Sequence, residues 1–366
     1  MSGHIVFTES SPNVGGQELQ LMQQMKALEA EGYQCTLACR PSGRVETMAR
    51  QRGLQTLAVP FRNSIHLPSI LKLRNLFREV RPSMVICHSG HDTNNAAIAC
   101  RLVRPRPFLL RSRTYLTGKS KAFSYNRLID ATMVPSDYLR QSLLSNPEIN
   151  AAKIHVVYPG IDFEAIDKHC DAPLPKDVTD WIAAGQGPLL LHVAMLRGEK
   201  GHLLLLDALA RLMSRWPSLR YLIAGEGAER DAIEASVRQH GLQSHVLLAG
   251  QVVPASALYR RADLLVMPSQ FEPLGMSQIE ALALAVPVLA SRTGGIPETI
   301  TDGKTGRLVE PANVDAWVTS IDAALKDLDE MKRMAREGSL DVRSRFSVEN
   351  NIKQILQLQS EYHQHP

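Results

Sequence analysis

The sequence has no long uninterrupted apolar run. No stretch approaches the roughly 18 apolar residues that a membrane-spanning helix needs, so no transmembrane helix is predicted. Residues 1–7 enter a β-rich run directly and lack the charged and apolar regions of a signal peptide. Cysteine is scarce: the five residues are odd in number and lack metal-ligand spacing. This usage favours reduced structural thiols in a cytoplasmic protein and predicts no metal site.

Acidic residues are scarce in the first half of the chain, and basic residues are slightly outnumbered in the second. Residues 1–165 contain 20 Lys and Arg against 12 Asp and Glu (+8), and residues 166–366 contain 21 against 25 (−4), which sum to +4. The basic half favours an anionic partner, such as a membrane surface, a phosphorylated lipid or an acidic glycan, with a solvated surface as the alternative. Nucleic acid is disfavoured because no known nucleic-acid module or stacking aromatic pattern accompanies the charge. The clustered residues are Lys72, Arg74, Arg78, Arg81, Arg101, Arg104, Arg106, Arg111 and Arg113.

The length and the hydrophobic pattern predict two α/β domains. At 366 residues the chain is too long for one ordinary core. Short β-rich runs alternate with amphipathic segments from 5–8 to 154–157, and the pattern restarts at 188–193. This alternation predicts parallel sheets with helices on both faces. Segments rich in proline and glycine at 165–187 mark the boundary. The expected architecture is two doubly wound domains facing a cleft, with ligands at the carboxyl ends of the strands.

Two loops that follow predicted strands carry residue types suited to phosphate. In the first half, Gly15 and Gly16 lie between a strand and its helix. Glycine there lets the backbone approach a phosphate, and the helix start supplies N–H donors; an ordinary turn is the alternative. In the second half, Arg197 and Lys200 follow the run 188–193. Fixed cations there could stabilise a leaving diphosphate in the transition state, and the alternative is a basic loop ahead of a helix.

The segment 271–280 holds two carboxylates eight positions apart. Glu272 lies in a Pro/Gly turn, and Glu280 lies about a turn and a half into a predicted helix that runs to Ala285. The backbone N–H groups of 274–277 could face a phosphate, with Glu280 on a ribose and Glu272 on a sugar. Paired carboxylates could also serve acid–base catalysis, but placement on a loop and a helix favours substrate binding. A solvated Glu280 is disfavoured because its neighbours are apolar and a buried carboxylate needs partners.

Together these segments resemble the GT-B glycosyltransferases of family 4, which are retaining enzymes that use nucleotide-activated sugars. Glu272 and Glu280 match that family's pair of glutamates separated by seven residues. Further matches follow in the family's order over almost the whole chain, at 157–162, 200–201, 224–227, 294–298 and 302–306. The resemblance implies an α/β GT-B fold of two Rossmann-like domains facing a central cleft. It assigns 1–165 plus 347–366 to an acceptor domain and 166–346 to a donor domain, with the C-terminal helix crossing back to the first.

The resemblance also implies a role for each matched residue. No cofactor and no metal is implied, and the nucleoside diphosphate sugar is the co-substrate. The implied contacts are, for the donor sugar, Glu272, Leu274 and Gly275; for the ribose, Glu280; and for the diphosphate, Arg197, Lys200, Gly15, Gly16 and Met276.

Two departures from the family pattern bear on these roles. Many relatives have Gly-Arg where this chain has Ala194 and Met195, so Arg197 is assigned that arginine's role. Many relatives also carry a histidine after the strand that corresponds to 108–111, where this chain has arginines instead. A structural histidine is the alternative for each histidine proposed in its place. The acceptor-side candidates are His88, His91, Arg111 and Arg113.

The resulting hypothesis is transfer of a hexose-type sugar, with retention, from a nucleoside diphosphate sugar to a glycan or lipid-linked acceptor. A UDP-sugar is the default donor, and the acceptor is expected to carry phosphate or to lie at the anionic inner face of the cytoplasmic membrane. Synthesis of a bacterial envelope polysaccharide or lipopolysaccharide is the expected setting. One alternative is a sugar-nucleotide epimerase or hydrolase, since related folds host both. The other is a non-catalytic nucleotide-sugar-binding subunit, because Met195 and the missing histidine depart from the family.

Overall fold

The computed structural model describes residues 3–115 and 121–364, which form two compact units. The first unit comprises Met1–Ile161 with Phe346–Pro366, and the second comprises Asp162–Arg345. The sequence predicted that the first domain gives way to the second after residue 165, whereas the structure has this boundary between Ile161 and Asp162. The reason is that Asp162 caps helix α6 (Phe163–His169), accepting a hydrogen bond from Ala165 N at 2.8 Å, and α6 packs within the second unit.

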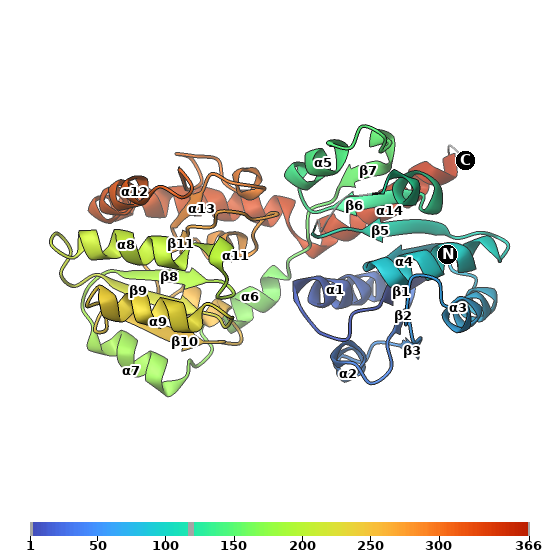
Figure 1. Cartoon of the computed structure of the whole chain (residues 1–366), viewed down its shortest axis with the longest axis horizontal. Coiled ribbons are helices and arrows are strands. Elements are labelled where there is room, and N and C mark those ends of the chain that lie inside the picture. Colours follow the sequence, from blue (N-terminus) through green and yellow to red (C-terminus); the bar gives the residue numbers. More distant parts are fainter. Residues whose placement is uncertain (1–2, 116–120, 365–366) are drawn as a thin grey trace. The chain divides into compact units, whose positions relative to one another are not determined.

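The first unit is built on a seven-stranded parallel sheet with the order β3-β2-β1-β4-β5-β6-β7 (Figure 1). The strand order reverses direction between β1 and β4, so the loops after these two strands flank a topological switch point. The strands are β1 (His4–Glu9), β2 (Gln34–Cys39), β3 (Thr56–Ala58), β4 (Met84–Cys87), β5 (Phe108–Ser112), β6 (Ala131–Val134) and β7 (Ile154–Val156). The helices are α1 (Gly16–Ala30), α2 (Arg44–Gln51), α3 (Leu67–Val80), α4 (Gly90–Arg101), α5 (Asp137–Leu144) and α14 (Val348–Gln364), with a π-helix at Ser124–Leu128 and a 3-10 turn at Ala151–Lys153.

Both faces of this sheet are buried, which explains why its strands read as continuous apolar runs. Side chains alternate between the faces: Ile5 and Phe7 of β1 belong to one hydrophobic cluster, and Val6 belongs to the other. Helix α14 packs beside α1 on the first face, where Gln24 donates a hydrogen bond to Asn351 Oδ1 at 2.9 Å. The C-terminal helix is therefore part of the first unit.

The second unit is built on a six-stranded parallel sheet with the order β10-β9-β8-β11-β12-β13. Its switch point lies between β8 and β11. The strands are β8 (Leu189–Val193), β9 (Arg220–Ala224), β10 (Val246–Gly250), β11 (Leu264–Met267), β12 (Val288–Ser291) and β13 (Arg307–Val309). The helices are α6, α7 (Lys176–Ala184), α8 (His202–Leu212), α9 (Arg230–Gln239), α10 (Ser256–Tyr259), α11 (Ser277–Ala283), α12 (Val314–Lys326) and α13 (Leu328–Arg345), with 3-10 turns at Gly198–Lys200 and Ile296–Glu298.

The structure confirms the predicted fold class of two doubly wound α/β units. All five cysteines are buried and unpaired. Burial raises the pKa of the Cys35, Cys39 and Cys100 thiols to about 12, so these groups stay protonated and inert at neutral pH. Among the helices that the structure describes, none is both long and apolar enough to cross a membrane.

Candidate functional site

The switch point of the second unit brings Lys200 and Glu272 together, although they are 72 positions apart. Lys200 ends the turn after β8, and Glu272 lies in the loop after the neighbouring strand β11. The Lys200 ammonium forms an ion pair with Glu272 Oε2, and both side chains are largely buried. A backbone hydrogen bond from Gln270 N to Glu199 O (2.8 Å) joins the two loops beside the pair. The sheet topology thus places a cation and a carboxylate at one point of the ligand-binding edge.

Glycines allow these loops to approach each other. Gly201 has a φ of +74°, and a Cβ there would lie 2.0 Å from Pro268 O. Gly294 has a φ of +55°, and its Cβ would lie 1.9 Å from Glu272 O. The next amide, Gly295 N, donates to the same carbonyl at 3.0 Å. Both positions therefore need glycine for backbone conformation and for space.

Gly201→Ala is expected to destabilise the second unit by at least about 2 kcal/mol more than Gly241→Ala, because it adds overpacking to strain. Gly241 is the matched control: its φ is +67°, but a Cβ there would meet nothing within 4 Å. Urea unfolding of both variants, followed by tryptophan fluorescence, measures the difference. Equal stabilities would contradict the close approach of 201 to Pro268.

The loop that carries Arg197 is held by the loop after β9. Ala194 N donates to Ala224 O (3.1 Å), and Leu196 N donates to Glu226 O (3.0 Å). The Arg197 backbone is thereby positioned, while its side chain is 53% exposed and its guanidinium lies 3.9 Å from Glu199 Oε1. Arg197 can therefore reach an anion near Lys200. The same loop exposes Met195, the residue that departs from the family pattern.

Glu280 has a partner that sequence reasoning missed. It lies on α11, and its Oε2 accepts a hydrogen bond from the hydroxyl of Tyr259 at 2.8 Å. Burial raises the pKa of Glu280, and the hydrogen bond from Tyr259 offsets part of the rise. Ser277 Oγ donates to Val193 O (2.7 Å), which ties the start of α11 to the end of β8. The predicted extension to Ala285 is wrong: the helix ends at Ala283 because Ala285 adopts a left-handed φ of +55°.

The residues between the two glutamates are positioned by Gln278, a second partner that the sequence did not reveal. This fully buried side chain donates to Leu274 O (2.8 Å) and to Thr299 Oγ1 (3.1 Å). Gly275 has a φ of +87°, and a Cβ there would lie 2.4 Å from the Gln278 amide. Met276 is partly exposed. The loop 272–276 is therefore set by packing before any ligand binds.

In the first unit, the glycine turn lies at the switch point after β1. Gly15 N donates to Glu18 Oε2 at 2.8 Å, so the turn is closed by its own helix. A Cβ at Gly16 would meet nothing within 4 Å. The contacts of the described chain therefore do not require glycine at 16, and the space in front of it is open to an incoming group.

A buried acidic network that sequence reasoning missed lies beside this turn. Glu9 accepts from Ser89 Oγ (2.6 Å) and from Gln17 Nε2 (2.8 Å). Asp92 accepts from His88 N at 3.0 Å, and burial together with Glu9 raises its pKa. Polar residues directly after β1 and β4 were the available signal, because parallel strands end at one edge of the sheet.

The four acceptor-side candidates separate in the structure. His88 is buried, its Nδ1 lies 3.1 Å from Thr8 O, and burial lowers its pKa, as expected of a structural histidine. His91 is exposed and its Nδ1 lies 3.1 Å from Ser64 Oγ. Arg111 is buried and Arg113 is partly buried, and both line one pocket.

Two arginines of the basic cluster have hydrogen-bond partners within the first unit, although Arg101 is exposed. Arg106 binds Asp130 through two hydrogen bonds, at 2.7 and 3.0 Å. Arg101 donates to the carbonyl of Ala97 at 2.8 Å. These two arginines therefore have partners within the chain, which a charge count along the sequence does not reveal. Over residues 3–115 and 121–364, no group of three or more His, Cys, Asp or Glu side chains has the arrangement to hold a metal.

Comparison with known proteins bears on this geometry. Residues 177–340 match the family described as "Glycosyl transferases group 1", and residues 14–165 match "Glycosyltransferase Family 4". D-inositol 3-phosphate glycosyltransferase of Segniliparus rotundus is 31% identical over 241 residues, which cover 63% of this chain and 51% of the relative. The match to this curated relative thus spans about half of the relative's length.

Solved structures share the fold. A glycosyltransferase from Rickettsia africae superposes with a TM-score of 0.87 at 21% identity and covers 100% of both chains. HepE of Anabaena, solved in complex with UDP, superposes with a TM-score of 0.85 at 20% identity, covering 99% of this chain and 100% of HepE. The two family matches, the two parallel sheets and these structural neighbours all point to the same family and fold. The chain belongs to glycosyltransferase family 4 and has the GT-B fold.

Proposed function

We propose that the chain is a retaining glycosyltransferase that moves a hexose from a nucleoside diphosphate sugar, by preference a UDP-sugar. The observation that carries the proposal is the Lys200–Glu272 pair at the switch point of the second unit. Solved structures of HepE, which include complexes with UDP and with UDP-glucose, support a donor of this class. The family membership supports the transfer chemistry.

In this proposal the cations of the second unit bind the diphosphate. Lys200 is held near the sheet edge, and Arg197 is exposed on a fixed loop. A leaving nucleoside diphosphate gains negative charge as the glycosidic bond breaks, so cations that are already positioned stabilise the transition state more than the ground state. The open space at Gly16 suits a phosphate approaching the first unit.

The two glutamates bind the two ends of the donor. Glu272 lies beside Lys200, where its carboxylate can accept hydrogen bonds from sugar hydroxyls. Glu280, oriented by Tyr259, can accept both hydroxyl protons of a ribose. A carboxylate neutralised by an ammonium is a poor nucleophile, which favours a same-face displacement in which the leaving phosphate helps to deprotonate the acceptor.

Glu280→Gln is expected to raise the KM for the donor at least about tenfold with kcat changed less than threefold. The change removes a charged acceptor that binds substrate and transition state equally. Tyr259→Phe should act in the same direction and more weakly, since it only releases the carboxylate. Steady-state kinetics over a donor series measures both.

Glu234→Gln, on α9 of the same unit, is the matched control, because its carboxylate is partly exposed and paired with Arg230. An unchanged donor KM in Glu280→Gln would contradict the ribose assignment.

A thermal-shift panel of UDP-, GDP- and ADP-sugars tests the proposal as a whole. A ligand that binds the folded state raises the apparent stability with the logarithm of its concentration over Kd. Stabilisation by a nucleotide sugar together with transfer to an added acceptor supports the proposal. Donor conversion without acceptor points to an epimerase or hydrolase, and binding without turnover points to a non-catalytic subunit. No stabilisation by any donor would contradict it.

The acceptor is proposed to be a glycan or lipid-linked molecule of an envelope polysaccharide. The basic helix α3, with Lys72, Arg74 and Arg78 on it, supports contact with an anionic membrane surface. Binding of the full chain to vesicles that contain anionic lipid, at low ionic strength, tests this extension.

A further inference from the structure

A pocket of about 340 Å³ lies in the first unit at the ligand-binding edge of its sheet. It is lined from β5 by Arg111, from the start of α4 by Gly90, and from the π-helix by Ser124 and Tyr125. Strands β4 and β5 are neighbours in the parallel sheet, so their carboxyl ends open into the same region. π-helices are rare and concentrate at functional sites.

The charges that line this pocket are all positive. Arg111, Arg113 and Lys121 line it, and the remaining lining residues that the structure describes are neutral. Arg111 is only 7% exposed, and its Nε has no hydrogen-bond partner among the described residues. Its guanidinium lies over the ring of Tyr125 at 5.1 Å and reaches Ser124 Oγ only at 3.4 Å. A buried guanidinium without a carboxylate is costly, so an anion that entered this pocket would be stabilised by Arg111.

Arg106 is an arginine of the same unit that has a carboxylate partner, and it provides a comparison for Arg111 and Arg113. Arg106 forms a two-fold hydrogen bond with Asp130 and a contact to the Tyr362 hydroxyl at 3.1 Å. At the pocket, by contrast, burial lowers the pKa of Arg113; the neighbouring Tyr125 opposes this effect and the charge of Arg111 adds to it. The two guanidinium groups therefore repel each other where water is partly excluded.

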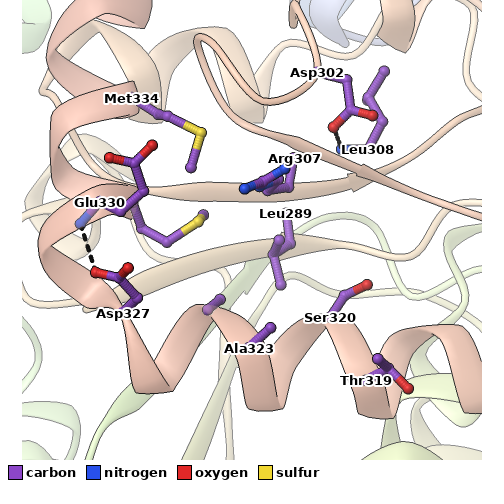
Figure 2. A pocket seen from close by; sticks show the side chains of 12 residues that line it. Leu289, Asp302, Arg307, Leu308, Thr319, Ser320, Ala323, Asp327, Glu330 and Met334 are labelled. Carbon is purple, nitrogen blue, oxygen red and sulfur yellow. Dashed lines mark hydrogen bonds between the residues drawn. The ribbon is translucent and has the colours of Figure 1, made fainter.

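A pocket in the second unit provides a contrast (Figure 2). It has a volume of about 520 Å³, lies between α12 and α13, and contains none of the site residues predicted from the sequence. Its carboxylates already have partners: Asp302 accepts from Leu308 N at 3.0 Å, and Asp327 accepts from Glu330 N at 3.1 Å. These two carboxylates therefore have hydrogen-bond donors within the chain, whereas Arg111 has no carboxylate partner among the described residues.

We propose that the Arg111–Arg113 pocket binds a phosphate group carried by the acceptor sugar. Three cations match a phosphomonoester, which carries a charge of about −1.5 to −2 at neutral pH, better than a single carboxylate. A guanidinium group can donate two parallel hydrogen bonds to two oxygens of one phosphate. The Ser124 hydroxyl can donate a further hydrogen bond. The volume suits a phosphorylated monosaccharide. The inference rests on the proposed function only in calling this ligand the acceptor.

Calorimetric titration of the full chain with glucose 6-phosphate, inorganic phosphate, glucuronate and glucose tests the proposal. Glucose 6-phosphate should bind at least tenfold more tightly than glucuronate, and glucose should not bind. Arg113 is partly buried, and Arg113→Met should weaken glucose 6-phosphate binding at least tenfold. Lys121 is exposed, and Lys121→Met should weaken it at least threefold. The double variant Lys26→Met/Arg52→Met, which removes two exposed cations of the same unit that have no part in the proposed sites, should bind as the wild type does.

Three results would overturn the inference: no binding of glucose 6-phosphate at 10 mM, a Kd for Arg113→Met within twofold of the wild type, or equal binding of glucuronate. Titration of the same samples with UDP and UDP-glucose separates the two proposals. Loss of donor binding with intact phosphate binding would contradict the proposed function alone. Intact donor binding without phosphate binding would contradict this inference alone.

Discussion

Lys200→Met is expected to lower kcat/KM for the nucleotide sugar by a factor of about 100 to 1000. The ammonium is fixed at the switch point by its ion pair with Glu272, so in the proposed site it would meet the developing diphosphate charge without reorganisation. In enzymes that stabilise a developing anion, removing one preorganised donor lowers the rate by about 100- to 1000-fold. Because the interaction grows in the transition state, kcat should carry most of the loss. Initial rates at saturating and at limiting donor measure the two parameters.

The variant also leaves the Glu272 carboxylate buried without its cation, which itself destabilises the fold. The double variant Lys200→Met/Glu272→Leu removes both charges and separates the effects: it should recover thermal stability without recovering activity. Lys304→Met, at an exposed lysine of the same unit, is the control and should retain full activity. Near-wild-type kcat/KM in Lys200→Met would exclude the diphosphate role.

The hydrophobic pattern predicted most of the fold because long elements carry a strong local signal. The run 5–8 lies within β1, and 188–193 contains β8. Strands β3 and β13 were not predicted, since each has three residues of which only one is β-branched, whereas the equally short edge strand β7 has two, Ile154 and Val156. The alternation of strands and helices also predicted which edge of each sheet would carry function, because parallel strands end together.

The partners within the site could not be predicted in the same way. Glu280 needed a partner because its sequence neighbours are apolar, but nothing local identifies Tyr259, which lies 21 positions earlier. In the sequence, Gln278 looks like an ordinary helix residue; only the structure shows that it bonds to Leu274 and Thr299. The same limit applies to charge: Arg106 and Arg111 look alike along the chain, yet among the residues that the structure describes only Arg106 of the two meets a carboxylate. Tertiary packing decides these pairings.

A buried pair of histidines beneath the Lys200 loop should set the acid stability of the second unit. His192, in β8, is fully buried, and His202, the first residue of α8, is 2% exposed. Their rings stack with centroids 4.3 Å apart, and His192 Nδ1 lies 2.8 Å from the Tyr221 hydroxyl. Burial, with Lys200 nearby, lowers the pKa of His202 to about 4, and burial lowers that of His192 well below its ordinary value. Neither ring is therefore charged in the folded protein at neutral pH.

The expected result is a fall in the free energy of unfolding as the pH drops below 6.5. The unfolded chain binds a proton at each histidine near pH 6.5, whereas folded His202 does not until about pH 4, so protons favour unfolding within this window. The stabilisation is fully present above pH 6.5, and His202 alone accounts for a loss of about 3 kcal/mol between pH 6.5 and pH 4. All three tryptophans, Trp181, Trp216 and Trp317, lie in the second unit, so urea unfolding followed by their fluorescence reports on this unit.

His202→Phe keeps an aromatic ring against His192 and removes one titrating group, so it should flatten the pH dependence by about 3 kcal/mol over this window. His169→Phe, the same substitution at an exposed histidine of α6, should leave the slope unchanged. An unchanged slope in His202→Phe would show that other groups control acid unfolding. Because the pair lies under the turn that carries Lys200, a stabilised His202→Phe variant would also allow donor binding to be measured at pH 5. Donor affinity lost there would then not reflect protonation of His202, and the raised pKa of Glu280 makes that carboxylate the first group to test by substitution.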